Sequence, residues 1–483
     1  MKNTQLATMA AREMTNINLG DARLDVRTRA IVSCIEKNPQ AGFPIAMEND
    51  SMLKSCYRFL NNDKVSFPKL LSPHQQETWK RIESMDEVLM PHDTTHFLFK
   101  GDCERSGLGR INSSDQGFLG HFSIATTLDA CPDVLGVVDA KLWTRDRDKL
   151  TPRKMLENKE ITRKEYLDMP SEMDRWWDQI KRIHDMNQSE TKIIHVMDRE
   201  ADDFKLLANM VTSGIHFVVR SCTDRHLVET AGLEGEAART RAMMNTLPLT
   251  GSRIVRINRR GNSGGRKKSK DLGVRDERFA ELSCCATSIN IKRPEYIESE
   301  DYPPSVMLNM VCVTEKNAPA GCEPVSWFLL TSEPIDTPEQ IWKIVDIYKC
   351  RWVIEEFFKS IKTGCRFEDR QLESIKSLQN ALALMCPVAW KLLRLRTMAG
   401  SDRQLPATKV LSENEIAVLR DLTVLKLPRN PSVAEALAAV AQIGGHSKYS
   451  KLRPGWMVLG RGFLRLLDTA KGYDLAMLQR CVL

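Results

Sequence analysis

The stretch from Pro338 to Gly364 constrains the fold most, because no glycine or proline interrupts it and it is predicted to form one continuous helix. An α-helix turns by about 100° per residue, so polar side chains at suitable spacing gather on one face. Four of them fall within roughly 60° of one another: Tyr348, Arg351, Glu355 and Lys362. The helix is therefore predicted to carry a phenol, a carboxylate and two cations along one stripe.

The other side of this helix is apolar. It offers Ile344, Ile347, Ile354, Phe358 and Ile361 for burial, while Trp352 and Lys359 lie next to the polar stripe. A carboxylate with cations along the same face suits a site that binds a metal ion and an anionic backbone. The alternative is an ordinary amphipathic helix whose charges pair on a solvated surface.

Length and charge allow a nucleic-acid partner. The chain has 483 residues, enough for two or three domains, and 70 basic against 63 acidic residues give a net charge of +7. The N-terminus lacks the apolar segment of a signal peptide, and no run of about eighteen apolar residues occurs, so we expect no membrane association. The thirteen cysteines include no CxxC pair, which favours reduced thiols in a cytosol.

Residues 1–70 are predicted to form a small helical module, with helices beginning after Asp21, at Ser51 and at Phe67. Basic side chains stand one turn apart on two of these helices. They are Arg23 and Arg27 on the first and Lys54 and Arg58 on the second. This arrangement suits a helix placed against DNA, where arginines contact phosphates and guanine edges; the alternative is a solvated basic face.

The pattern changes from helical to strand-like at about residue 85. Strands are predicted over 88–99, 117–129 and 134–144, with short links that favour antiparallel pairing. An apolar strand over 192–198 then precedes a helix over 201–210 and a strand over 216–220. Three antiparallel strands followed by strand, helix and strand are typical of a ribonuclease-H-like core. Asp93 lies in the first strand and Asp198 ends the fourth.

The remaining sequence gives an insertion and a C-terminal helical region. Residues 225–335 alternate in the manner of β-strands, and the run 256–270 holds seven basic residues, no acidic residue and three glycines. Beyond residue 371 the pattern is mostly helical. The predicted fold is α/β: an N-terminal helical module (1–70), a ribonuclease-H-like core (71–380) with a β-rich insertion, and a C-terminal helical domain (381–483).

Three acids are candidates for chemistry: Asp93, Asp198 and Glu355. Cleaving or joining a phosphodiester needs an activated nucleophile and charge stabilisation, which two Mg²⁺ ions held by carboxylates can supply, with Mn²⁺ as a substitute. Each acid could instead cap a helix or form a local ion pair. A rival zinc or manganese site would use His92, His96 and His195, but His92 and His96 share a strand face that Asp93 does not.

The motifs resemble the bacterial DDE transposases of the insertion-sequence-four family, most closely its transposon-five group. Asp93-Thr94-Thr95 resembles the first acid motif, Asp198 to Asp202 the second, and the spacing Tyr-x2-Arg-x3-Glu-x6-Lys from Tyr348 to Lys362 the third. The stretches 19–23 and 57–60 resemble the family's end-binding domain. The likeness implies that the three acids bind the metals. It also implies DNA contacts from Arg220, Tyr348, Arg351 and Lys362, and base stacking by Trp327. Lys359, which lies beside the stripe, is a further candidate DNA contact.

The resemblance implies cut-and-paste transposition by a homodimer that binds double-stranded DNA with terminal inverted repeats and then target DNA. Nicking, hairpin formation and resolution, and strand transfer would follow in the bacterial cytoplasm, at the nucleoid. The insertion differs in length and in its basic tip from this group. Two other functions remain open from the sequence: a catalytically silent DNA-binding inhibitor of transposition, and a related structure-specific nuclease.

Overall fold

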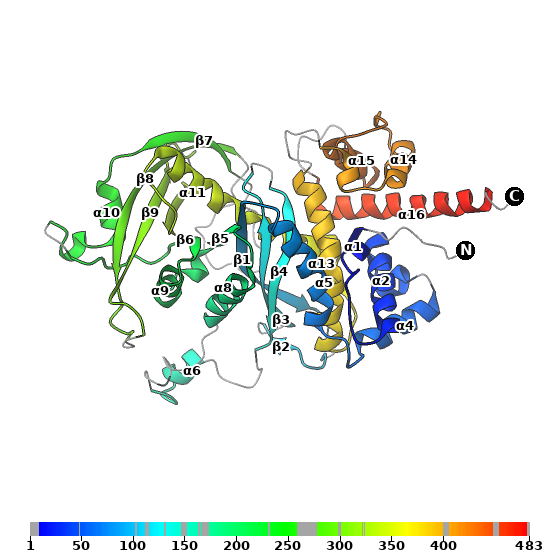
Figure 1. Ribbon diagram of the computed structural model, residues 1–483, viewed down its shortest axis with the longest axis horizontal. Coiled ribbons are helices and arrows are strands. Elements are labelled where there is room, and N and C mark those ends of the chain that lie inside the picture. The colour runs from blue at the N-terminus through cyan, green and yellow to red at the C-terminus, as the bar shows by residue number, and fades with distance from the viewer. Residues whose placement is uncertain are drawn as a thin grey trace. The chain divides into compact units, whose positions relative to one another are not determined.

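The computed structural model shows a mixed α/β chain that divides into two compact units (Figure 1). Unit 1 comprises Met1–Val88, Asp93–Met169 and Trp352–Leu483, and unit 2 comprises Leu89–His92 and Pro170–Arg351. The structure describes residues 9–480 except 48, 102–103, 112–114, 130–131, 146–151, 163–164, 166–172, 230–231, 258–277, 298–300, 321, 323, 399–404 and 448–453. The basic run 256–270 therefore lies almost wholly outside the described residues.

Unit 1 begins with short helices whose predicted starts are confirmed. Asp21 caps the second of them by accepting a hydrogen bond from the Arg23 amide at 3.0 Å, and Asn49 caps the fourth through the Met52 amide at 2.9 Å. The very short α1 and α3 were not predicted, because four residues are too few to show a period. The helices are α1 (Met9–Arg12), α2 (Ala22–Lys37), α3 (Phe43–Ala46), α4 (Asp50–Leu60) and α5 (Phe67–Ile82).

Strands of unit 1 follow the helices as predicted. β3 pairs antiparallel with both β2 and β4, and the strand order is β2-β3-β1, with β4 also on β3. Residues Leu89–His92 of the first strand belong to unit 2 and Asp93–Phe99 to unit 1. The strands are β1 (Glu87–Phe99), β2 (Gly109–Arg110), β3 (Gln116–Thr126) and β4 (Val134–Trp143), and the short helix α6 (Pro152–Glu157) comes after them.

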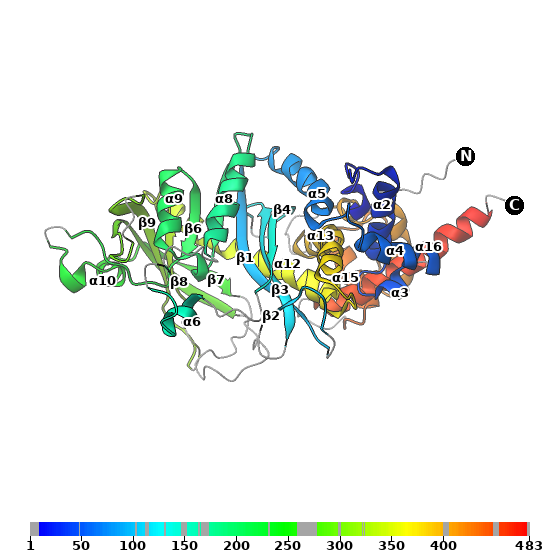
Figure 2. The same ribbon diagram turned by 90° about the horizontal axis from the view of Figure 1, so that it is seen from below.

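The long helix α13 (Ile375–Met398) is the centre of unit 1. It is buried along most of its length and packs against α2, α4, α5 and β4 (Figure 2). The N-terminal helices thus share one hydrophobic core with the C-terminal ones. The other C-terminal elements are α12 (Trp352–Lys359), η3 (Ser360–Gly364), η4 (Phe367–Asp369), η5 (Ala407–Lys409), α14 (Glu413–Leu422), α15 (Val433–Ile443) and α16 (Trp456–Arg480).

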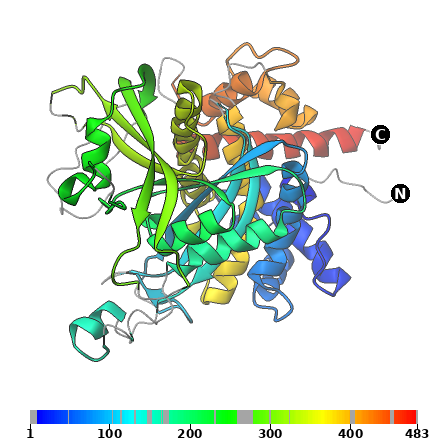
Figure 3. The ribbon, with the colours of Figure 1, turned by 60° about the vertical axis from the view of Figure 1, so that its left-hand side comes forward.

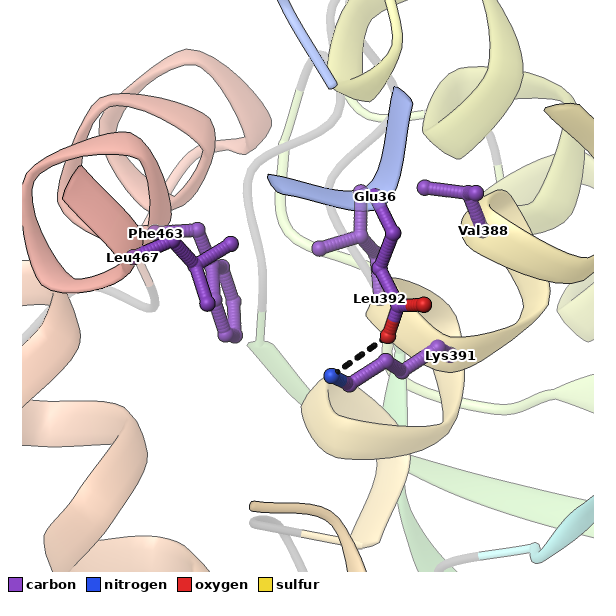
Figure 4. A pocket seen from close by; sticks show the side chains of 6 residues that line it. All are labelled: Glu36, Val388, Lys391, Leu392, Phe463 and Leu467. Carbon is purple, nitrogen blue, oxygen red and sulfur yellow. Dashed lines mark hydrogen bonds and ion pairs between the residues drawn. The ribbon is translucent and has the colours of Figure 1, made fainter. Parts of the chain in front are cut away.

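A buried ion pair joins the two ends of the chain within this core. The Lys391 ammonium lies 2.8 Å from Glu36 (Figure 4). It also lies 3.8 Å from Glu415. Burial alone would lower the pKa of Lys391, but the two carboxylates outweigh it and the pKa is raised. Side chains of α2, α13 and α16 line the small pocket around the pair: Glu36, Val388, Lys391, Leu392, Phe463 and Leu467.

Unit 2 contains a mixed sheet in the order β5-β6-β10-β9-β8-β7, with β5 and β6 parallel and the other neighbours antiparallel. The long ribbon of β8 and β9 forms part of the predicted β-rich insertion (Figure 3). The strands are β5 (Lys192–Met197), β6 (His216–Arg220), β7 (Gly251–Ile257), β8 (Arg278–Lys292), β9 (Ser305–Glu315) and β10 (Ser326–Thr331). The helices are α8 (Asp174–Met186), η1 (Arg199–Ala201), α9 (Phe204–Thr212), η2 (Gly235–Ala237), α10 (Thr240–Thr246) and α11 (Pro338–Cys350).

The predicted continuous helix over 338–364 is wrong in one respect, because it is divided at Arg351. There the backbone amide bonds the Tyr348 carbonyl three residues earlier, at 3.2 Å. The five residues Ser360–Gly364 then form a π-helical turn, in which the Cys365 amide bonds the Ser360 carbonyl at 2.8 Å. Neither feature interrupts the spacing of the apolar residues, so the sequence pattern does not predict them.

The predicted division into domains 1–70, 71–380 and 381–483 stays a prediction. The two compact units of the structure follow other boundaries. The apolar residues assigned to the buried side of the predicted helix are all buried: Ile344, Ile347, Ile354, Phe358 and Ile361. Within the part of the chain that the structure describes, no helix is both long and apolar enough to span a bilayer.

Candidate functional site

Asp93 is half-buried in β1, between residues that are mostly buried. Its carboxylate accepts a hydrogen bond from the Thr94 amide at 2.8 Å, and the Thr94 hydroxyl lies 3.0 Å from His121 Nδ1. Strand alternation places Asp93 on the same face as Phe97, and His92 and His96 on the other. A partly exposed carboxylate held by its own strand is suited to meet a cation.

Asp198 follows the last residue of β5 and caps η1. Its carboxylate accepts a hydrogen bond from the Glu200 amide at 2.8 Å, so the local capping contact weighed from the sequence does form. A carboxylate offers about four acceptor positions, and capping uses one of them. The cap therefore fixes the orientation of Asp198 and leaves the carboxylate capable of binding a cation as well.

Glu355 and Glu356 are neighbours on α12 with different surroundings. Glu356 lies 2.7 Å from Lys359 and 2.8 Å from Arg396, and it accepts a hydrogen bond from the Trp456 indole at 3.1 Å. Burial would raise the pKa of Glu356, but the Arg396 charge and the bonds to Lys359 and Trp456 outweigh it and the pKa is lowered. Glu356 is thus engaged in holding helices together, and Glu355, half-buried one residue earlier, stays the predicted functional acid.

The three acids are divided between the two units: Asp93 and Glu355 belong to unit 1 and Asp198 to unit 2. Among the described residues, no group of three or more histidine, cysteine, aspartate or glutamate side chains forms a ready-made metal site. Convergence of the three carboxylates on metal ions therefore stays a prediction. The donor set itself fits Mg²⁺, a hard cation that prefers carboxylate oxygens on partly solvated side chains.

The predicted cationic stripe is less uniform than the sequence indicates. Tyr348 is 7% exposed and Arg351 9% exposed, so both are largely buried. The Tyr348 ring packs edge-on against Trp327 with 5.3 Å between the centroids. Lys359 is exposed and lies over the Trp352 ring at 5.1 Å. Trp327 thus packs against Tyr348 of the predicted stripe. The two residues are 21 positions apart, so the sequence pattern does not predict this contact.

Lys362 contacts protein groups on β1. Its ammonium donates to the His96 carbonyl at 2.5 Å, lies 3.6 Å from Glu368 and sits 5.5 Å from the centre of the Phe97 ring. Burial lowers the pKa of Lys362, although Glu368 opposes the shift. Lys362 is half-buried and engaged by these protein groups, so it is not a free phosphate-binding group in this structure.

Arg220 ends β6, where its guanidinium donates to the Ser326 carbonyl at 3.3 Å. On the N-terminal helices, Arg23 is 91% exposed and pairs with Asp21 at 3.1 Å. Arg27 is half-buried, with its guanidinium 4.0 Å from the Met52 sulfur. Lys54 and Arg58 are exposed on α4. Arg23, Lys54 and Arg58 are accordingly the exposed members of the two basic pairs on these helices.

Asp202 is a residue whose importance the sequence did not reveal. Its fully buried carboxylate binds Arg225 Nη2 at 2.6 Å and the amides of Cys222 and Thr223 at 2.7 and 2.8 Å. Burial would raise the pKa of Asp202, but the Arg225 charge outweighs it and the pKa is lowered. Asp202 therefore fixes the segment after Arg220 to the segment after Asp198. The only sequence feature that singles out Asp202 is its position at the end of the motif Asp198 to Asp202, which resembles the second acid motif of the family.

The histidines form an internal pair. His92 Nε2 and His195 Nδ1 lie 2.7 Å apart, with the rings stacked at 5.0 Å, and the two residues are 0% and 2% exposed. Burial, together with the charges of His184 and His216, lowers the pKa of His195 to about 3. His195 is therefore neutral at pH 7 and held in a hydrogen bond, and His96 lies on the exposed part of β1. Because His92 and His195 contact each other through these nitrogens, and no third metal-binding side chain joins them among the described residues, the structure supplies no support for the rival zinc site.

Two segments of the chain match models of known protein families. Residues 7–65 match the model of the family Transposase DNA-binding, and residues 170–389 match that of the Transposase DDE domain. These matches support a DDE-type transposase. The first matched segment contains the basic pairs of α2 and α4, and the second contains Asp198 and Glu355. Asp93 lies outside both.

One solved structure with similarity to this chain is a piggyBac transposase synaptic complex with hairpin DNA, determined by cryo-electron microscopy. The sequences are 7% identical and the TM-score is 0.30, over 81% of this chain and 66% of that chain. This chain thus spans slightly less than two thirds of that transposase.

Proposed function

We propose that the protein is a cut-and-paste DNA transposase of the bacterial insertion-sequence-four family, with a ribonuclease-H-like core. The observation that carries the proposal is the position of Asp198 and Glu355. Both lie inside the segment that matches the Transposase DDE domain, one at the end of a buried strand and the other on a helix. Strand ends and facing helices are where a metal-dependent phosphoryl-transfer site needs its acids.

The arrangement within unit 1 supports pairing Asp93 with Glu355. Lys362 on the helix side touches His96 and Phe97 on β1, so this contact is a fixed point shared by the two elements. Asp93 lies on the strand that this contact touches, and Glu355 lies on the helix that precedes Lys362.

The proposed site would hold two Mg²⁺ ions, or Mn²⁺ in their place, on Asp93, Asp198 and Glu355. When bound, the ions would supply an activated nucleophile and charge stabilisation at phosphorus. The chain's own groups would place the DNA beside these acids: Arg220, Arg351, Lys359 and Lys362 would face phosphates, with Tyr348 beside them. Arg23, Arg27, Lys54 and Arg58 would bind the terminal inverted repeats.

The later steps extend the same proposal. Nicking at the element end would be followed by hairpin formation and resolution and by strand transfer into target DNA, in a homodimer that pairs two ends in the bacterial cytoplasm. Trp327 would stack on a base displaced during hairpin formation. Its contact with the Tyr348 ring supports this role, since it orients the indole beside the proposed phosphate-binding stripe.

The test is cleavage of linear DNA that carries the element's terminal repeats, with Mg²⁺, by the wild type, by Glu355→Gln and by Glu77→Gln. We expect nicking at the repeat ends by the wild type and by Glu77→Gln, which changes an exposed ion pair on α5. Glu355→Gln should bind the ends with unchanged affinity and produce no nicks. Wild-type binding without any nicking would indicate a catalytically silent DNA-binding protein, and cutting that ignores the repeat sequence would indicate a structure-specific nuclease.

A further inference from the structure

The environment of Lys362 includes a second charged residue that the proposed chemistry does not use. Glu368 lies on η4, six residues after Lys362, and its Oε1 atom accepts a hydrogen bond from the Leu98 amide at 2.9 Å. The same atom lies 3.6 Å from the Lys362 ammonium, which itself donates to the His96 carbonyl. One carboxylate and one ammonium therefore serve two backbone groups of β1.

These two backbone groups lie on one edge of β1, because the carbonyl of residue 96 and the amide of residue 98 point to the same side of a strand. A neighbouring strand would normally satisfy such groups. Here two side chains do so, and the contact depends on where the turn after α12 places them. The end of β1 is thus held by the chain segment 362–368 and not by backbone pairing alone.

Aromatic packing reinforces the contact. Phe367, beside Glu368, packs edge-on against Phe97 at 5.2 Å and against Phe99 at 5.6 Å between centroids. Phe97 packs in turn against Phe122 at 6.3 Å, and Phe122 lies 6.0 Å from Phe357 on α12. Because these rings are buried and closely packed, a displacement of β1 would have to move α12 or open a cavity.

The backbone before η4 shows that this segment is tightly specified. Arg366 has φ of 49° and ψ of 46°, a left-handed conformation that is unfavourable for a residue other than glycine. The Arg366 side chain, which is exposed, pairs with Asp369 at 2.7 Å. This sharp turn brings Phe367 and Glu368 back against β1.

We propose that Glu368 is a positioning residue. Acting directly on Leu98, and on His96 through Lys362, it fixes the part of β1 that carries Asp93 against the helix that carries Glu355, and so sets the affinity of the site for divalent metal. This inference rests on the proposed function, because it assumes that Asp93 and Glu355 bind the metal. It adds that Lys362 is a link in this contact, so its contribution to DNA binding is smaller than the sequence indicates.

The experiment uses the full-length protein with Glu368→Ala, Glu368→Gln, Lys362→Met and the control Asp369→Asn. Asp369 is on the same turn but its side chain is 60% exposed and pairs with the exposed Arg366. Mn²⁺ affinity would be measured without DNA by electron paramagnetic resonance, and end-DNA affinity by fluorescence anisotropy. Amide exchange of residues 94–99 and Tm would be followed in parallel.

For Glu368→Ala we expect Mn²⁺ affinity to fall about tenfold or more, the range seen when groups behind metal ligands are removed. The 94–99 amides should exchange faster, while end-DNA affinity stays within about twofold of the wild type. Glu368→Gln should lose less, because its amide oxygen still accepts from Leu98, and Lys362→Met should resemble Glu368→Ala in metal affinity. Asp369→Asn should match the wild type in every measurement.

Two outcomes overturn the inference. One is a folded Glu368→Ala protein with wild-type Mn²⁺ affinity and wild-type exchange at 94–99. The other is a Lys362→Met protein that loses end-DNA affinity more than about tenfold while keeping Mn²⁺ affinity, which makes Lys362 a phosphate contact only. If Glu368→Ala does not fold, Glu368→Gln and Lys362→Met decide between these results. If the wild-type protein neither binds Mn²⁺ nor cuts end DNA, the proposed function itself is rejected. If the wild type cuts end DNA but Glu368→Ala keeps wild-type Mn²⁺ affinity and amide exchange, only this inference is rejected.

Discussion

The Glu356 carboxylate accepts a hydrogen bond from the Trp456 indole at 3.1 Å, and this contact ties α12 to α16 across 100 residues of sequence. Arg396 completes the cluster: it lies 2.8 Å from Glu356, and its guanidinium stacks over the Trp456 ring at 4.6 Å. The helix that carries Glu355 is therefore anchored to α13 and α16 through the very next residue. Stability and catalysis should separate at these two adjacent glutamates.

Replacing Glu356 should destabilise unit 1. Glu356→Ala removes the acceptor that Arg396 and the Trp456 indole share, and losing one partner of a half-buried charged hydrogen bond costs about 1 to 3 kcal/mol. Urea unfolding followed by tryptophan fluorescence would measure this loss. Glu355→Ala, which leaves the Arg396 and Trp456 contacts of Glu356 in place, should lose less stability than Glu356→Ala. Equal losses from the two variants would contradict the separate roles assigned to them.

The buried Glu13 should make stability depend on acid pH. Burial would raise its pKa, but the hydrogen bonds from His74 and from Arg81, at 2.6 and 2.9 Å, lower it from 4.5 to about 2. A carboxylate with a lowered pKa stabilises the fold above pH 4.5, and this contribution disappears as the pH falls towards 2. It amounts to about 3 kcal/mol.

The matching experiment compares the unfolding free energies of the wild type and Glu13→Gln at pH 7 and pH 3. The difference in unfolding free energy should be large at pH 7 and smaller at pH 3, where the wild type has already lost much of the Glu13 contribution. Glu83→Gln, an exposed glutamate at the end of α5, is the control and should show no such narrowing. A difference that stays constant between the two pH values would exclude ionised Glu13 as the source.

The parts of the fold that depend on local pattern were predictable. Alternation located β1, β3 and β4 to within a few residues, and the start signals at Asp21 and Phe67 located α2 and α5. These features rest on side-chain periodicity and on capping within one turn. A single sequence contains both kinds of information.

The parts that depend on distant groups were not predictable. The break at Arg351 leaves the apolar period of the helix intact, so nothing in the pattern indicates it. Lys362 shows the general reason: its ammonium binds the carbonyl of His96, 266 positions earlier, where a cationic stripe on an isolated helix would face solvent. Asp202 likewise binds amides about 20 positions away. Carboxylate chemistry and the family resemblance indicate the metal ligands, and the convergence of the three carboxylates on metal ions stays a prediction.

The N-terminal basic residues should divide into sequence readers and phosphate contacts. Arg23→Ala should reduce affinity for the terminal repeats by about 1 to 3 kcal/mol and leave affinity for unrelated DNA nearly unchanged. Lys54→Ala should weaken the affinity for the terminal repeats and the affinity for unrelated DNA about equally. It should also reduce the slope of log affinity against log salt concentration by about one, the value expected for one lost phosphate contact. Lys80→Ala, an exposed lysine on α5, serves as the charge-matched control. An unchanged repeat affinity for Arg23→Ala would remove it from the reading surface.

Trp327 should matter for one step of the reaction and not for the others. Its indole packs on Tyr348 at 5.3 Å between centroids, and the residue is only half-buried, so an aromatic surface is held in place and partly open. Stacking on a displaced base is worth about 1 to 3 kcal/mol. Trp327→Ala should therefore nick the element end at the wild-type rate but form about tenfold less hairpin product. Trp327→Phe should recover part of the hairpin product, because a phenyl ring still offers a stacking face.

Phe279→Ala removes a 73% exposed aromatic of β8 and is the control. Denaturing gel analysis separates nicked, hairpin and joined strands in one reaction. Since nicking precedes hairpin formation in this scheme, equal losses of both products would show that Trp327 supports the core of unit 2 and not the displaced base.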